Sequence, residues 1–169
     1  RNGKEGIGMN GFLYSLALQW RLDIRSKSLL VTYYIVPLIF FLLMGGIFTS
    51  VIPDMDSTLI QSMIVMSVSM GAFLGLPPSL IETYGSDIKK IYKANGVPIH
   101  LGLVTMVLSA FVHLIMTCMV ILLLAPILFK ASLPSQFPLF FLALAIYIFV
   151  SLSIGSILGL TVNNQAKLT

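Results

Sequence analysis

Four long runs of apolar residues dominate the chain and predict four membrane-spanning helices. The runs cover residues 29–52, 58–81, 99–124 and 137–162. Each is close to or above the roughly 20 residues that a helix needs to cross a hydrocarbon core of about 30 Å. None contains Asp, Glu, Lys or Arg, and none alternates polar and apolar residues as a barrel strand does. Because lipid offers backbone groups no partner, the pattern predicts an all-α fold, a polytopic membrane helical bundle.

The residues before the first run follow a different, helical spacing. Phe12, Leu16, Trp20 and Ile24 recur every four positions, and polar residues lie between them. This pattern predicts an amphipathic helix within residues 1–28 that lies in the headgroup region of the membrane. The alternative is that the segment only extends the first span into the cytoplasm.

Composition supports a membrane protein and excludes several other classes. Hydrophobic residues make up 57% of the 169 residues and charged residues only 9%, against about 25% charged in soluble domains. The single cysteine excludes an internal disulfide framework, and no Cys/His cluster has the spacing of a metal site. The net charge of +4 comes without an aromatic and basic platform, so no nucleic-acid partner is predicted.

Positive charges predict the orientation. They precede the first run, separate the second from the third, and follow the fourth: Arg21, Arg25, Lys27, Lys89, Lys90, Lys93 and Lys167. With four spans these three segments share one side, which the positive-inside rule makes cytoplasmic. Both ends of the chain are therefore expected in the cytoplasm.

The cytoplasmic loop 82–98 carries the start and stop signals of a short helix. Ser86 is a good N-cap, Asp87 complements the positive end of a helix, and Gly96 is placed to close it just before Pro98. A helix of about two turns is marginal alone. The loop is therefore expected to dock on a partner.

Apolar and basic residues alternate within this short helix. The apolar ones are Ile88, Ile91 and Tyr92. The basic ones are Lys89, Lys90 and Lys93. The apolar group is the candidate docking surface, and the alternative is a solvated loop whose lysines only fix the topology.

The order of these features resembles the membrane subunit of type-2 ABC transporters, the ABC exporter permeases. In that family an acidic residue, a Gly-Ser/Thr pair, a short helix and a small-residue/Pro turn connect the second and third spans. Here Glu82, the pair Gly85 and Ser86, "DIKKIYK" and "NGVP" follow in that order.

The resemblance implies a set of roles and partners. Residues 1–28 would hold a cytoplasmic tail and the family's elbow helix, 29–169 the transmembrane domain, and 82–98 the coupling loop. The implied partners are a cytoplasmic ATP-binding subunit, a second permease half in a homo- or heterodimer, and membrane lipid, in the plasma (inner) membrane of a bacterium. The implied ATPase-coupling residues are Glu82, Ser86, Ile88, Lys89, Lys90, Ile91, Tyr92 and Lys93.

The chain departs from the family in its number of spans. Such permeases usually have six, so the sequence is interpreted as the N-terminal part of a longer permease. The pattern G-x-x-x-x-G-K-[ST] does not occur. ATP hydrolysis is therefore expected on a separate chain or domain, and the segment itself is expected to be a transport subunit with no catalytic residue, cofactor or metal.

Few polar residues lie within the spans. Ser109, His113 and Thr117 form a stripe at helical spacing on the third run. Hydrogen bonds to a neighbouring helix are the main interpretation, and a substrate or proton role is the alternative. Because the runs lack carboxylates, no intramembrane carboxylate is expected near His113.

Small and flexible residues suggest close helix contacts. Gly71 and Gly75, and Gly155 and Gly159, fit the small-xxx-small pattern, which packing within the chain explains best. A second group could either line a transport path or pack in the core. It consists of Met63, Met66 and Met70.

Two other classes of function stay open. A secondary carrier or channel would need charged or broken helices at the midplane of the membrane. An integral membrane enzyme would need paired carboxylates, a catalytic triad or a metal cluster at one depth. The uncharged spans favour the permease over both.

Overall fold

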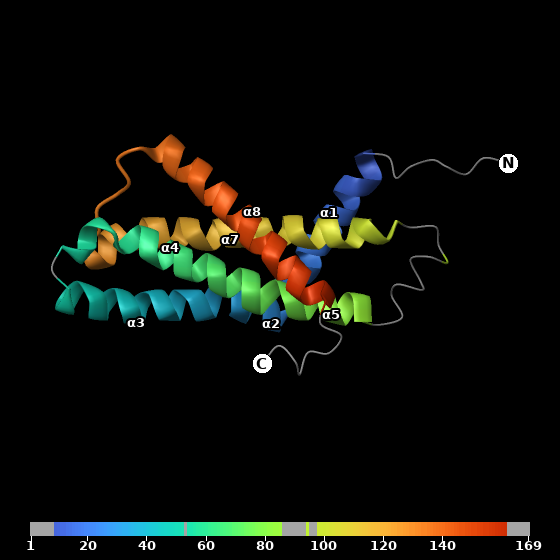
Figure 1. Cartoon of the computed structure of the whole chain (residues 1–169), viewed down its shortest axis with the longest axis horizontal. Helices are drawn as coiled ribbons and strands as arrows, with labels where there is room; N and C mark the ends of the chain where they lie inside the picture. The colour runs from blue at the N-terminus through green and yellow to red at the C-terminus, as the bar shows by residue number, and fades with distance from the viewer. Residues whose placement is uncertain (1–8, 53, 86–93, 95–97, 162–169) are drawn as a thin grey trace.

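A computed structural model of the chain describes residues 9–52, 54–85, 94 and 98–161 (Figure 1). Those residues are helical apart from short connections and contain no strand, which confirms the predicted all-α bundle. Four helical stretches are long and apolar enough to cross a membrane: Lys27–Val51, Leu59–Tyr84, His100–Phe129 and Phe137–Thr161. By the length and composition of these helices the chain is an integral membrane protein.

The first span is one helix with a π-helical turn in it. It consists of α2 (Lys27–Leu30), η1 (Val31–Ile35) and α3 (Val36–Val51). Pro37 explains the irregular turn, since proline has no N–H to donate to the carbonyl of Tyr33 four residues earlier. That carbonyl therefore needs a donor from another part of the chain.

The second span is also one helix with a π-helical turn in it. It consists of α4 (Leu59–Met70), η3 (Gly71–Gly75), which is again a π-helical turn, and α5 (Leu76–Gly85). The second apolar run of the sequence ends at Ile81, shortly after Pro77 and Pro78. The helix instead continues to Gly85, because the wider turn of η3 accommodates the missing N–H groups.

The third span is longer than the sequence suggests. Helix α7 (Ile99–Phe129) passes through Pro126 and ends five residues beyond the predicted limit. Lys130 closes it in the left-handed conformation, with φ 55° and its N–H bonded to the Pro126 carbonyl at 3.1 Å. Helix α8 (Phe137–Thr161) follows after a short loop and matches the predicted fourth span closely.

Glycines bring the fourth span against the second. A Cβ atom on Gly155 would overlap the carbonyl oxygen of Ala72, and one on Gly159 would lie 2.9 Å from Pro77 Cα. Gly75 similarly leaves room for the Tyr33 ring, 2.8 Å from where its Cβ would be. These small residues therefore serve packing within the chain, as predicted.

The three methionines of the second span do not share one environment. Met63 is buried in the core, whereas Met66 is 39% exposed and Met70 is half-buried. In this chain Met63 is therefore a core residue, and only Met66 faces outward.

Helix α1 (Met9–Arg25) precedes the bundle and crosses α7 near the end where α5 stops and α7 starts (Figure 1). Ser26 separates it from α2, and the Ser26 hydroxyl accepts a hydrogen bond from the N–H of Leu29 at 3.4 Å. Apolar side chains such as Leu13 and Leu22 are more than half exposed. The most buried side chain of α1 is instead acidic, that of Asp23, at 7% exposure.

Candidate functional site

The predicted coupling loop lies almost entirely outside the described residues. This holds for Ser86, Ile88, Lys89, Lys90, Ile91, Tyr92 and Lys93. Of the predicted coupling residues, Glu82 is described: it lies near the end of α5 and its side chain is exposed.

The predicted polar stripe on α7 is fully buried. Ser109, His113 and Thr117 have exposures of 1%, 2% and 0%. One turn of helix separates each from the next, so they face the same neighbours. Each contacts a different part of the chain before the second span.

Thr117 supplies the hydrogen-bond donor that the first span lacks. Its hydroxyl donates to the carbonyl of Tyr33 at 2.7 Å, which cannot receive the usual N–H four residues on because that residue is Pro37. The threonine thus ties α7 to the π-helical turn η1.

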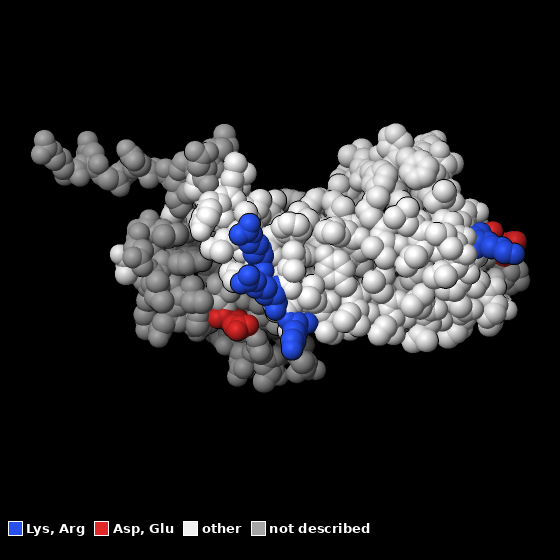
Figure 2. Space-filling model, turned by 180° about the vertical axis from the view of Figure 1, so that it is seen from behind, with Lys and Arg blue, Asp and Glu red and all other residues white. Residues whose placement is uncertain are grey.

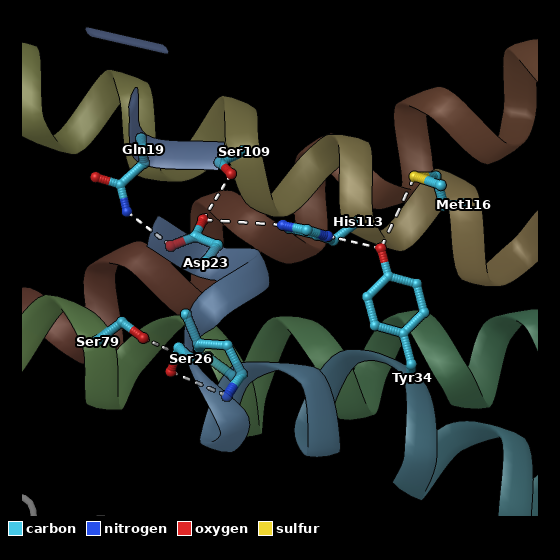
Figure 3. A network of polar contacts seen from close by, with 10 residues as sticks. Gln19, Asp23, Ser26, Tyr34, Ser79, Ser109, His113 and Met116 are labelled. Atoms are coloured by element: carbon cyan, nitrogen blue, oxygen red, sulfur yellow. Dashed lines mark hydrogen bonds and ion pairs between the residues drawn. The ribbon is translucent and has the colours of Figure 1, made fainter. Parts of the chain in front are cut away.

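Asp23 meets Ser109 at the crossing of α1 and α7. The Ser109 hydroxyl donates to Asp23 Oδ2 at 2.6 Å, and Gln19 Nε2 donates to Asp23 Oδ1 at 2.8 Å (Figure 3). The carboxylate is therefore held by two neutral donors. A buried carboxylate in this setting is a candidate functional group, because burial of a charge without an opposite charge is costly.

His113 lies beside this carboxylate. Its Nδ1 is 2.6 Å from the hydroxyl oxygen of Tyr34. Its Nε2 is 4.0 Å from Asp23 Oδ2 and has no hydrogen-bond partner among the described residues (Figure 3). When Tyr34 donates to Nδ1, the proton of the neutral ring lies on Nε2, on the side of Asp23.

Aromatic rings enclose the imidazole. The Tyr33 ring stacks on it with centroids 5.7 Å apart and planes 18° apart, and the Trp20 centroid is 6.5 Å away. Such an apolar enclosure strengthens any charge interaction of His113 with Asp23.

The sequence predicts no carboxylate within the spans beside His113, and it does not predict the carboxylate that comes from outside them. Asp23 lies on the preceding helix, 86 positions from Ser109. The one signal in the sequence was that Gln19 and Asp23 are four residues apart in the segment before the first span. That spacing places both on one face of a helix.

A cavity of about 410 Å³ adjoins Asp23, between the α1–α2 junction and the second span. Its polar lining includes two carboxylates, from Asp23 and Glu82, and no Lys or Arg side chain among the described residues. The other polar groups include the side chains of Gln19, Ser26, Ser28, Thr32 and Ser79.

Cations lie near the cavity but outside it. Arg21, Arg25 and Lys27 are exposed on α1 and α2. Figure 2 shows the basic side chains as a band across one face, while the opposite end of the bundle carries both signs of charge. At that end Asp54 and Asp56 lie in the connection between α3 and α4, and Lys130 lies in the connection between α7 and α8. The Ser132 N–H joins the two connections by donating to the Asp56 carbonyl at 2.9 Å.

The described residues offer no metal centre, since no group of three or more His, Cys, Asp or Glu side chains comes together in that part of the chain. Comparisons with protein-family models, curated proteins and solved structures give no match to this chain. The functional argument therefore depends on the residues and their geometry.

Proposed function

We propose that the chain is the membrane-spanning permease part of an ABC-type exporter and couples to a cytoplasmic ATPase through residues 82–98. The observation that supports this most is the grouping of three elements at one end of the bundle (Figure 1). Helix α1 lies there, α5 ends there at Gly85, and α7 starts there at Ile99. An interfacial helix beside the connection of the second and third spans is the arrangement expected of an elbow helix and a coupling loop.

The distribution of charge supports a cytoplasmic location for this end. Arg21, Arg25 and Lys27 are exposed on α1 and α2, and the positive-inside rule places such residues in the cytoplasm. They are also suited to contact anionic lipid headgroups. The proposal includes a second permease half and the plasma membrane of a bacterium.

Copurification tests the proposed ATPase partner. The full-length protein would be isolated from native membranes, intact and with Ile88, Ile91 and Tyr92 each changed to Asp. We expect an ATP-hydrolysing chain with the intact protein and at least a tenfold lower yield with the variant, because charges on a docking surface are desolvated without partners.

The matched control places Asp at the opposite end of the bundle. Leu133 is exposed in the loop after α7, and Leu133→Asp should leave the yield unchanged. Equal recovery with the intact protein and the triple variant would contradict the docking role.

One observation favours a second candidate, a proton-coupled secondary carrier. The pair of Asp23 and His113 is the kind of buried carboxylate and histidine that proton relays use. Uptake or export driven by a proton gradient in vesicles that hold the purified protein alone would favour this candidate over the permease.

A further inference from the structure

We propose that the cavity beside Asp23 binds an organic ammonium group. The site would take a primary ammonium, from either a lipid headgroup or a free amine. This inference goes beyond the proposed function, because it concerns a ligand site that requires neither ATP nor an ATPase.

The first argument is an unbalanced negative charge. Two carboxylates line the cavity, and none of its described lining residues is Lys or Arg. Asp23 is 7% exposed, and its hydrogen bonds come from the neutral groups of Gln19 and Ser109. A carboxylate this buried requires a positive partner or a bound cation to offset the loss of hydration.

The second argument is the state of His113. Its ring is 2% exposed, and its Nε2 atom has no hydrogen-bond partner, although it points to Asp23 from 4.0 Å. That distance is too long for a hydrogen bond. The histidine therefore leaves the charge of Asp23 available to a ligand in the cavity, which is lined by Asp23 and not by His113.

The third argument is size and chemistry. A volume of about 410 Å³ exceeds the space of a bare metal ion and falls in the range of sites for small organic molecules, roughly 300–1,000 Å³. Hydroxyl oxygens of Ser26, Thr32 and Ser79 in the lining can accept N–H hydrogen bonds. A polar organic cation matches both features.

The same geometry predicts how pH acts on binding. The other titratable groups that face the pair of Asp23 and His113 are Tyr33 and Tyr34 from η1. Glu82 lines the cavity together with Asp23. A histidine ring gains a positive charge when it takes up a second ring proton at low pH. A protonated ring places a positive charge beside Asp23, so the affinity for ammonium should fall as the pH is lowered.

Fluorescence of dansylcadaverine, a primary ammonium joined to a fluorophore, would measure binding to the purified full-length protein in phosphatidylglycerol nanodiscs. We expect Asp23→Asn to weaken binding by about tenfold or more, since one unit charge close to the ligand is removed. Glu82→Gln, at an exposed position that cannot disturb the core, should weaken it about threefold. Asp56→Asn, at the opposite end, is the matched control and should change nothing.

Competition identifies the source of the ammonium. Displacement of the probe by phosphatidylethanolamine in the nanodisc, but not by added ethanolamine, indicates a lipid headgroup, and the reverse indicates a free amine. Unchanged affinity in both Asp23→Asn and Glu82→Gln, or displacement by neither competitor, would overturn the proposal. Because no ATPase is present, the result is independent of the copurification test.

Measuring the affinity at several pH values separates a role of His113 in binding from a purely structural one. The affinity of the unmodified protein should fall as the pH is lowered, and that of His113→Gln should fall less. An equal fall in both proteins would contradict the role given to His113.

Discussion

Replacing Asp23 by leucine should release α1 from the bundle. The substitution removes the acceptor for both Ser109 and Gln19 and the only charge near His113 Nε2 among the described residues. A buried polar group left without a partner costs about 1–3 kcal/mol. Because the bond from Ser109 crosses from α7 to α1, whereas that from Gln19 lies within α1, we expect a loss of about 1–3 kcal/mol in the docking of α1.

Trp20 offers a direct measurement of this release. It is the single tryptophan of the chain and lies 6.5 Å from the imidazole of His113. In Asp23→Leu its fluorescence should shift in wavelength and intensity, and the amide hydrogens of Met9–Arg25 should exchange faster. Asp56→Leu, at an exposed position of the opposite end, should give the spectrum of the unmodified protein. Unchanged exchange of the α1 amide hydrogens in Asp23→Leu would show that the contacts of Asp23 do not hold the helix.

Replacing Gly155 by alanine should separate α8 from the second span. A Cβ at this position overlaps the carbonyl oxygen of Ala72, and a backbone atom cannot move aside without shifting its helix. Overpacking of this kind costs about 1–3 kcal/mol. The midpoint of thermal unfolding, followed by size-exclusion chromatography of heated detergent-solubilised protein, should therefore fall by several degrees.

Gly46→Ala is the matched control for Gly155→Ala. A Cβ on Gly46 would lie 3.9 Å from the Phe129 ring, which is an ordinary contact. The midpoint of this variant should stay the same or rise slightly, since alanine is the better helix former. Equal midpoints for Gly155→Ala and the unmodified protein would mean that α8 does not pack on Ala72 as closely as described.

The spans could be predicted from the sequence because a membrane imposes one requirement on every residue of a crossing helix. Residues 137–162 are apolar throughout, and the helix is Phe137–Thr161. The end of α7 could not be predicted in the same way. Pro126 is tolerated within the helix, and the closing turn depends on the left-handed conformation of Lys130, for which the residue type gives no signal.

The candidate site was only half predictable. The stripe of Ser109, His113 and Thr117 follows from helical spacing alone. Its partners Asp23 and Tyr34 lie far away in the chain, and only the crossing of α1 over α7 brings the carboxylate to the histidine. Spacing within one helix contains no information on which other helix will cross it.

Under the proposed function, which follows the resemblance to the exporter permeases, the hydrogen bond between Ser109 and Asp23 would transmit motion between α7 and α1. Asp23 connects α1 to α7, and α7 starts directly after the predicted coupling loop. A shift of that loop on nucleotide binding would therefore reach α1 through one hydrogen-bonded pair. Such a link requires that the loop contacts an ATPase, which is the central claim.

Site-specific crosslinking in native membranes tests this claim most directly. A photoreactive phenylalanine analogue would replace Ile91 in the predicted loop or, as the control, Leu133 at the opposite end of the bundle. The account predicts a crosslink from position 91 to a chain that binds and hydrolyses ATP, and none from position 133. Absence of such a chain at position 91, or equal crosslinking at both positions, would contradict the assignment of the protein as an ATPase-coupled permease.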